Sequence, residues 1–169
     1  MKKILCINGS TRKDSTNALL LKAFEILCPE YQFISASLEE IPSFHPDLDK
    51  NPLPQKISSW RLAIADSDFV LISTPEYLHN IPAILKNGFE WLSSSGELTN
   101  KKVLPIVFTP NAPRGAKAMK SMLWTLTALN AKVETSLLLH HDDFILKNNQ
   151  YIPKQTTAEF LKNAVHLYN

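Results

Sequence analysis

The side chains best suited to bind a ligand lie in segment 9–17, directly after the first apolar run of the chain. This segment carries hydroxyl, amide and guanidinium groups, and its candidate binding residues are Ser10, Arg12, Ser15, Thr16 and Asn17. Residues 4–8 are predicted to form a buried strand and residues 15–28 a helix, so the segment leads into a helix N-terminus. Unpaired backbone N–H groups and the positive end of the helix dipole attract anions there. We therefore predict a phosphate site, at which Arg12 adds a charge-assisted hydrogen bond.

This segment matches neither of the common glycine-rich phosphate motifs. A Walker loop and a dinucleotide fingerprint both require further glycines, and only Gly9 is present. A loop of hydroxyls and amides suits a terminal monophosphate that is held from several sides. The alternative is an ordinary helix start, with Ser15 as N-cap and with Ser10 and Asp14 as turn residues.

Length and composition restrict the class of protein. The 169 residues suit one domain spanning 1–169, and the net charge of +2 predicts neither a nucleic-acid nor a membrane partner. The apolar run after Met1 is too short for a signal peptide or a membrane span. Cys6 and Cys28 lie in predicted core positions without metal-ligand spacing, so we expect reduced thiols in a cytoplasmic protein.

Strand-like and helix-like segments alternate along the chain. The predicted strands are 4–8, 31–36, 68–73, 103–108 and 132–139, and the predicted helices are 15–28, 57–65, 82–92, 116–129 and 156–167. The strand at 31–36 alternates apolar and polar residues, which is typical of a sheet edge. Segment 41–54 holds four prolines and is predicted to be an irregular loop.

This alternation predicts an α/β fold with parallel strands and right-handed crossovers. We expect a flavodoxin-like three-layer sandwich whose five-stranded sheet has the order 2-1-3-4-5. Ligands of such sheets bind beyond the carboxyl ends of the strands, at the switch point between strands 1 and 3. The loops expected there are 9–15, 74–81 and 109–115, and the polar chemistry of the chain is concentrated in them.

The second of these loops suits a planar ligand. Pro75 stiffens the strand exit, backbone N–H groups after it can face a heterocycle, and Tyr77 offers an aromatic surface. The alternative is a proline-capped loop with Tyr77 packed on the surface. In the third loop, two prolines remove N–H donors and Arg114 is the charged group.

Together, the first two loops resemble the NADPH-dependent FMN reductase family of flavodoxin-like proteins. The family motif G-S-x-R-x-x-S-x-N is complete at Gly9, Ser10, Arg12, Ser15 and Asn17. The family segment P-E-Y-N-x-S-x-P-G-x-L-K-N is matched at Pro75, Glu76, Tyr77, Pro82, Leu85, Lys86 and Asn87. The chain departs from this second pattern at Leu78, Asn80 and Ala83.

The resemblance implies a bound FMN, with NADPH or NADH as electron donor and hydride transfer to flavin, quinone or similar small acceptors. It places the FMN phosphate on Ser10, Arg12, Ser15, Thr16 and Asn17. The ring would lie against the second and third loops, at Pro75, Glu76, Tyr77, Leu78, Asn111, Arg114 and Gly115. For Glu76, a polar contact with a helix or a second subunit is an equal alternative to a role at the flavin.

The family resemblance also implies a homodimer or homotetramer packed through the helices after strands 3 and 4. Large apolar residues on these helices permit such a face: Phe89, Trp91, Met119, Met122 and Trp124. For Lys86 and Asn87 we expect support of the loop or an oligomer contact.

Two other classes of function stay open, namely a flavodoxin-like electron carrier and a flavin-free interaction protein that retains the fold. A metal site at residues 140–143 is disfavoured, because adjacent residues on an extended chain point to opposite sides. We expect a solvated loop near the rim of the active site there instead. The chain has no G-x-S-x-G nucleophile elbow, so we do not predict a hydrolase. The resemblance gives the redox chemistry to the flavin, so we expect no catalytic side-chain nucleophile.

Overall fold

The computed structural model describes residues 1–50 and 52–168, and its centre is a five-stranded parallel sheet. Its strands are β1 (Lys3–Asn8), β2 (Gln32–Ala36), β3 (Phe69–Thr74), β4 (Lys102–Thr109) and β5 (Leu137–His140). Their order is β2-β1-β3-β4-β5, which confirms the predicted fold class. The alternating strand β2 lies at the edge, as its pattern predicted.

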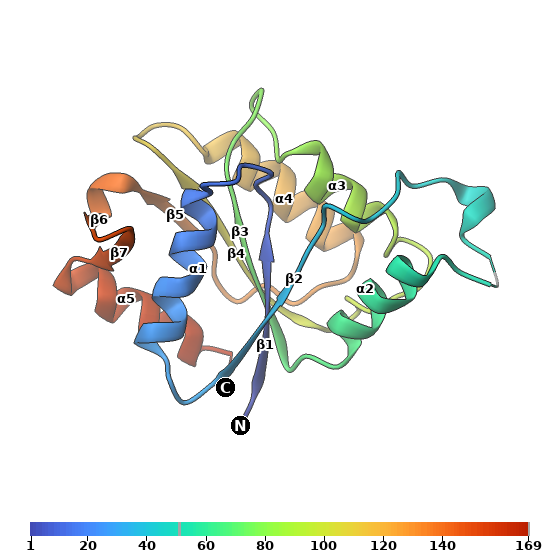
Figure 1. Ribbon diagram of the computed structural model, residues 1–169, viewed down its shortest axis with the longest axis horizontal. Helices are drawn as coiled ribbons and strands as arrows, with labels where there is room; N and C mark the ends of the chain where they lie inside the picture. The colour runs from blue at the N-terminus through green and yellow to red at the C-terminus, as the bar shows by residue number, and fades with distance from the viewer. Residues whose placement is uncertain (51, 169) are drawn as a thin grey trace.

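Helices cover both faces of the sheet (Figure 1). One face carries α1 (Thr16–Leu27) and α5 (Gln155–His166), and the other carries α2 (Gln55–Ala65), α3 (Ala83–Glu90) and α4 (Ala116–Ala128). Strand β3 is covered by helices on both faces, so it is apolar on both. Phe69 packs in the layer of α1 and α5, and Val70 packs in the layer of α2, α3 and α4. In the described part of the chain, no helix is long and apolar enough to cross a bilayer.

The three predicted loops gather at one end of the sheet (Figure 1). They follow the carboxyl ends of β1, β3 and β4, whereas both chain termini lie at the opposite end. Cys6 and Cys28 are buried and not joined by a disulfide. The fold therefore brings the polar loop residues to the switch point between β1 and β3.

The prediction of the fifth strand was wrong at its start. Only Leu137–His140 form the strand, not residues 132–139. The hydroxyl of Tyr168 accepts hydrogen bonds from the backbone N–H groups of Glu134 (3.1 Å) and Thr135 (3.2 Å). This side chain reaches the segment from the end of the chain, so the backbone N–H groups that a strand would use are occupied.

The polar stretch predicted before the last helix contains an antiparallel hairpin, β6 (Phe144–Lys147) and β7 (Gln150–Pro153). Its turn residues Asn148 and Asn149 have φ values of 49° and 58°, which asparagine tolerates better than most residues. Two asparagines between short apolar segments were the signal for this hairpin. Its residues Phe144 and Tyr151 pack into the core beside α1.

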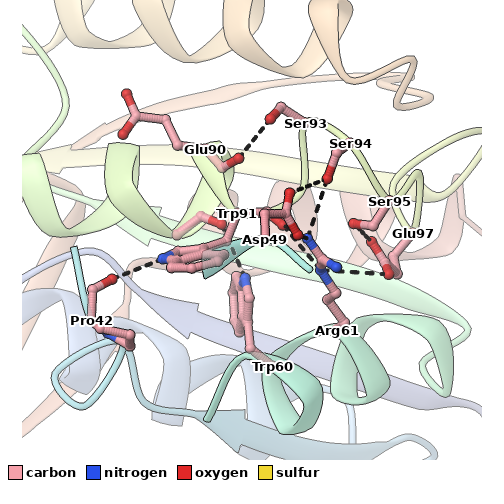
Figure 2. Close-up of polar contacts among 11 residues, drawn as sticks. Pro42, Asp49, Trp60, Arg61, Glu90, Trp91, Ser93, Ser94, Ser95 and Glu97 are labelled. Carbon is pink, nitrogen blue, oxygen red and sulfur yellow. Dashed lines mark hydrogen bonds and ion pairs between the residues drawn. The ribbon is translucent and has the colours of Figure 1, made fainter. Parts of the chain in front are cut away.

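The proline-rich loop 41–54 is held by α3. Its short 3₁₀ turn (η1) spans Pro46–Leu48, and Asn51 lies outside the described residues. The side chain of Asn87 donates to the carbonyl of Pro42 (3.0 Å) and accepts from the N–H of Phe44 (2.7 Å). Trp91 Nε1 also donates to Pro42 (2.8 Å; Figure 2). Asn87 therefore supports this loop and does not line the cavity described below.

A largely buried ion pair joins the same loop to α2 (Figure 2). Arg61 Nη2 donates to Asp49 Oδ1 at 2.8 Å and to the carbonyl of Trp91 at 2.6 Å. Ser94 donates to the other carboxylate oxygen of Asp49. The side chains of Arg61 and Asp49 are only 12% and 9% exposed, so each charge depends on its partner.

The large apolar residues of α3 and α4 are divided between core and surface. Phe89, Trp91, Met119 and Met122 are buried, whereas Trp124 is 67% exposed. Lys120 Nζ lies 4.9 Å from the centre of the Trp124 ring. One apolar side chain of this set is thus available on the outer face of α4.

Candidate functional site

A cavity of about 220 Å³ lies at the carboxyl ends of β1, β3 and β4. It is lined by Ser10, Arg12, Thr16, Asn17, Pro75, Glu76, Tyr77, Phe108, Thr109, Pro110, Arg114 and His141. All three loops contribute to this wall, together with the residue that follows β5. Four predicted residues do not line it: Ser15, Leu78, Asn111 and Gly115.

The first loop is shaped by Asn8 and Gly9. Asn8 Oδ1 accepts from the N–H of Ser10 (3.1 Å) and from the hydroxyl of Ser15 (3.3 Å). Gly9 donates to the carbonyl of Ser73 at 2.8 Å. A Cβ atom on Gly9 would lie 2.5 Å from Thr74 Oγ1, so only glycine permits this approach to β3.

Hydrogen-bond donors predominate at the start of α1. Ser15 is the N-cap and accepts from the N–H of Ala18 (3.2 Å), so the N-cap alternative is correct for this residue. The first-turn N–H groups of Thr16 and Asn17 have no acceptor inside the helix. Asn17 lines the cavity, and its Oδ1 accepts from Ser73 Oγ (2.8 Å), so the amide NH₂ group is not used in that bond. With the guanidinium of Arg12, these donors favour an anion.

Glu76 joins the second loop to the N-terminus of α4. Its buried Oε2 accepts from the N–H groups of Gly115 (3.1 Å) and Ala118 (3.0 Å). Burial raises the pKa of Glu76, but hydrogen bonds from Ala118, His79 and Gly115 outweigh it and lower the pKa. The helix contact considered for Glu76 is the one observed, and it also occupies the N–H of Gly115. The carboxylate is thus a fixed anion at a helix N-terminus.

Leu78 points away from the cavity. Tyr77 and Asn80 exchange two backbone hydrogen bonds of 2.9 Å around a two-residue turn. Leu78 and His79 have φ values of 50° and 61°, and the Leu78 side chain is fully exposed. Asn80 accepts from Ser121 of α4 at 2.5 Å, which fixes the base of the turn.

This turn makes a prediction for stability. Leu78→Asn should raise the free energy of unfolding by about 1 kcal/mol, because asparagine tolerates the left-handed conformation. Urea denaturation measures this change. Leu62→Asn is the control, since Leu62 is also exposed but lies in helix α2, where asparagine lowers helix propensity. A lower free energy of unfolding in Leu78→Asn would contradict the idea that the left-handed backbone of Leu78 costs stability.

The third loop is tied to the end of β5. Thr109 Oγ1 lies 3.1 Å from the carbonyl of Arg114 and 3.0 Å from Nδ1 of His140. The hydroxyl has a single proton and a carbonyl only accepts, so Nδ1 of His140 is the donor in its contact. Arg114 lines the cavity, while Asn111 is exposed and lies outside it.

Sequence analysis missed His141. Its backbone N–H donates to the carbonyl of Pro110 (3.3 Å), and its ring packs against Phe108 and Tyr151. The segment lies at the rim of the cavity, as expected, and Asp142 is exposed, but His141 is not solvated, because its Nε2 is buried. Its position directly after β5, at the carboxyl end of a sheet strand, was the sequence feature that could have indicated a residue near the site. No group of three or more metal-ligating side chains occurs within residues 1–50 and 52–168.

Similarity to known proteins agrees with this geometry. A family model described as NADPH-dependent FMN reductase matches residues 2–142. The chain belongs to this family. The FMN reductase match ends just after His141, so the hairpin and α5 lie beyond it. As a member of this family, the chain is an NAD(P)H- and FMN-dependent oxidoreductase.

Several relatives carry names from the same chemistry. The chain is 32% identical to a NADH:(hydroxy)cinnamate reductase subunit, CrdA, of Vibrio ruber, over 86% of this chain and 71% of that protein. It is 28% identical to a 2-hydroxy-1,4-benzoquinone reductase of a Burkholderia species, over 98% and 93% of the two chains. Among solved structures, the NAD(P)H:(acceptor) oxidoreductase FerB of Paracoccus denitrificans has a TM-score of 0.85 at 24% identity, covering 99% of this chain and 95% of that one. That structural similarity supports the fold.

Proposed function

We propose that the cavity binds FMN, with its phosphate at the start of α1 and its ring toward the second and third loops. The observation that carries this proposal is the concentration of donors on the first loop, at the switch point of the sheet. Pro75 and Tyr77 supply a stiff wall on which a planar ring can lie. The carboxylate of Glu76 accepts hydrogen bonds at the N-terminus of α4, so the protein itself compensates its negative charge.

The residues present fit this cofactor. Arg12 of the first loop and Arg114 of the third loop both line the cavity and can bind anionic groups. FMN supplies the capacity to accept a hydride and to pass on electrons. The chain binds and orients it, through the donors of segment 10–17 and the wall at 75–77.

We propose quinones and free flavins as the small-molecule acceptors. The 2-hydroxy-1,4-benzoquinone reductase named above supports quinones, since this chain matches 93% of its length. The test is the visible spectrum of the purified protein, recorded before and after anaerobic NADPH or NADH. Flavin bands that bleach, and return when benzoquinone is added, are expected. Bands that persist with both donors would favour an electron carrier, and no bands after soaking with FMN would contradict the proposal.

Arg12 provides a direct test of the phosphate position. Arg12→Gln should raise the Kd for FMN by about 10- to 100-fold, because a charge-assisted hydrogen bond is lost. Riboflavin lacks the phosphate, so its Kd should change little. Quenching of flavin fluorescence on titration measures both values. Lys13→Gln is the matched control, since Lys13 has the same charge but does not line the cavity; equal effects of the two variants would contradict the assignment.

We further propose that residues 1–169 form one FMN-binding domain that acts as a homodimer or homotetramer in the cytoplasm. The exposed Trp124 on α4 supports an apolar subunit contact, and two buried, unpaired cysteines suit a reducing compartment. Light scattering of the purified protein tests the oligomer. Trp124→Glu should then shift the mass toward the monomer, and an unchanged mass would exclude this face.

A further inference from the structure

Nε2 of His141 is a buried polar atom without a hydrogen-bond partner in the described part of the chain. An unsatisfied buried polar atom costs free energy, and most such atoms in folded proteins have a partner. The surrounding structure nevertheless holds this ring firmly. Neighbouring protein atoms close Nε2 to solvent, so a ligand oxygen reaches it only when a covering side chain moves, and the cavity that His141 lines is where such a ligand would enter.

The ring of His141 has a defined orientation. Its centre lies 5.1 Å from that of Phe108 and 5.7 Å from that of Tyr151, and both partners belong to the buried core. The hydrogen bond from its backbone to Pro110 fixes the main chain beside the third loop. The side chain contributes to the same cavity wall as Arg12 and Thr16.

The face of the sheet on which the His141 ring packs indicates which part of a ligand it would contact. Phe108 and Tyr151 pack in the core layer that includes α1. The N-terminus of α1 is the proposed phosphate position, whereas the wall for the ring is formed by the second loop. His141 therefore lies on the face of the sheet that carries the phosphate donors.

Burial lowers the pKa of His141, although the nearby Asp142 acts in the opposite direction. The neutral imidazole is thus the form at pH 7. It offers one N–H donor, which suits a phosphate or hydroxyl oxygen, and one acceptor, which suits a hydroxyl group that donates.

We propose that His141 is a further cofactor-binding residue, whose Nε2 forms a hydrogen bond with an oxygen of the phosphate or ribityl part of FMN. This inference rests on the proposed FMN site. It assigns a binding role to the residue after β5, which contributes nothing to the two sequence motifs. The contact also gives the buried Nε2 the partner that it lacks within the protein.

The variant His141→Phe separates binding from packing, because phenylalanine retains a ring between Phe108 and Tyr151. Without the cofactor, its free energy of unfolding should equal or exceed that of the wild type, since an unsatisfied polar atom is removed. Its Kd for FMN should nevertheless rise by about tenfold. His141→Gln, whose amide can approach the position of Nε2, should recover part of the affinity.

Comparison of FMN with riboflavin identifies the oxygen. A loss for FMN alone indicates the phosphate, and an equal loss for both indicates the ribityl chain. Nitrogen-15 NMR of histidine-labelled protein provides a readout independent of affinity, because the Nε2 signal of His141 should shift when FMN is added. His166→Phe is the control, since His166 is exposed and pairs with Glu30 outside the cavity wall.

A wild-type Kd for FMN in His141→Phe would overturn the inference. Parallel losses of apoprotein stability and FMN affinity would also overturn it, since they indicate a packing role. If the wild type does not bind FMN, the proposed function fails together with this contact. The wild-type titration separates that result from a failure of the His141 contact alone.

Discussion

Replacing Glu76 with alanine is expected to lower the free energy of unfolding by about 3 kcal/mol. The substitution leaves two buried backbone N–H groups, those of Gly115 and Ala118, without their acceptor. It also removes an anion from the N-terminus of α4. Because these bonds join the second loop to the third, the Kd for FMN should rise as well. Urea denaturation and FMN titration measure the two effects.

The pH dependence of the Glu76 contribution has a definite sign. The pKa of Glu76 is lowered in the folded protein, so its contribution is fully present above the unfolded value of about 4.3 and declines as pH falls through the folded pKa. The stability difference between wild type and Glu76→Gln should therefore narrow in acid. Glu90→Ala is the control, because Glu90 forms an exposed pair with Lys86. A Glu76→Ala protein as stable as Glu90→Ala at pH 7 would contradict the assignment.

Arg61→Met should also destabilise the protein, by about 3 kcal/mol. The variant retains an unbranched apolar side chain but leaves the buried carboxylate of Asp49 with Ser94 as its remaining partner in the described network (Figure 2). It also removes the donors to the carbonyl of Trp91, at the end of α3. Urea denaturation at pH 7 measures the loss.

A second substitution separates buried charge from packing. The hydrogen bond from Ser94 lowers the pKa of Asp49; burial raises it, and Arg61 lowers it further. The pKa is therefore below its usual value, and Asp49 is ionised at pH 7. Arg61→Met with Asp49→Asn should recover part of the stability, because the charge of Asp49 is then removed, while Glu97, 3.9 Å from Arg61 Nε, still loses its partner. Lys56→Met, which breaks the exposed pair with Glu40, should have little effect. Since these residues lie outside the cavity, a changed Kd for FMN would contradict their purely structural role.

Local patterns in the sequence were sufficient for the architecture. Periodicity along the chain predicted the five sheet strands and five helices, and alternation predicted the parallel order and the edge position of β2. The segment from Gly9 to Asn17 could be interpreted because its donors, glycine and helix start are neighbours in sequence. Such features depend on contacts between nearby residues, which the sequence displays directly.

Tertiary structure decided which polar groups meet across distant segments. Glu76 lies 39 and 42 residues from its partners Gly115 and Ala118, and no periodicity links them. The hydroxyl of Tyr168 occupies backbone N–H groups just before β5, and the ring of His141 packs against Phe108 of the core beside α1. These outcomes depend on how the helices and strands pack, because burial determines which hydrogen bonds a polar group must make. The sequence alone therefore predicted the fold and the position of the polar first loop, whereas packing decided the hydrogen bonds of Glu76 and the burial of His141.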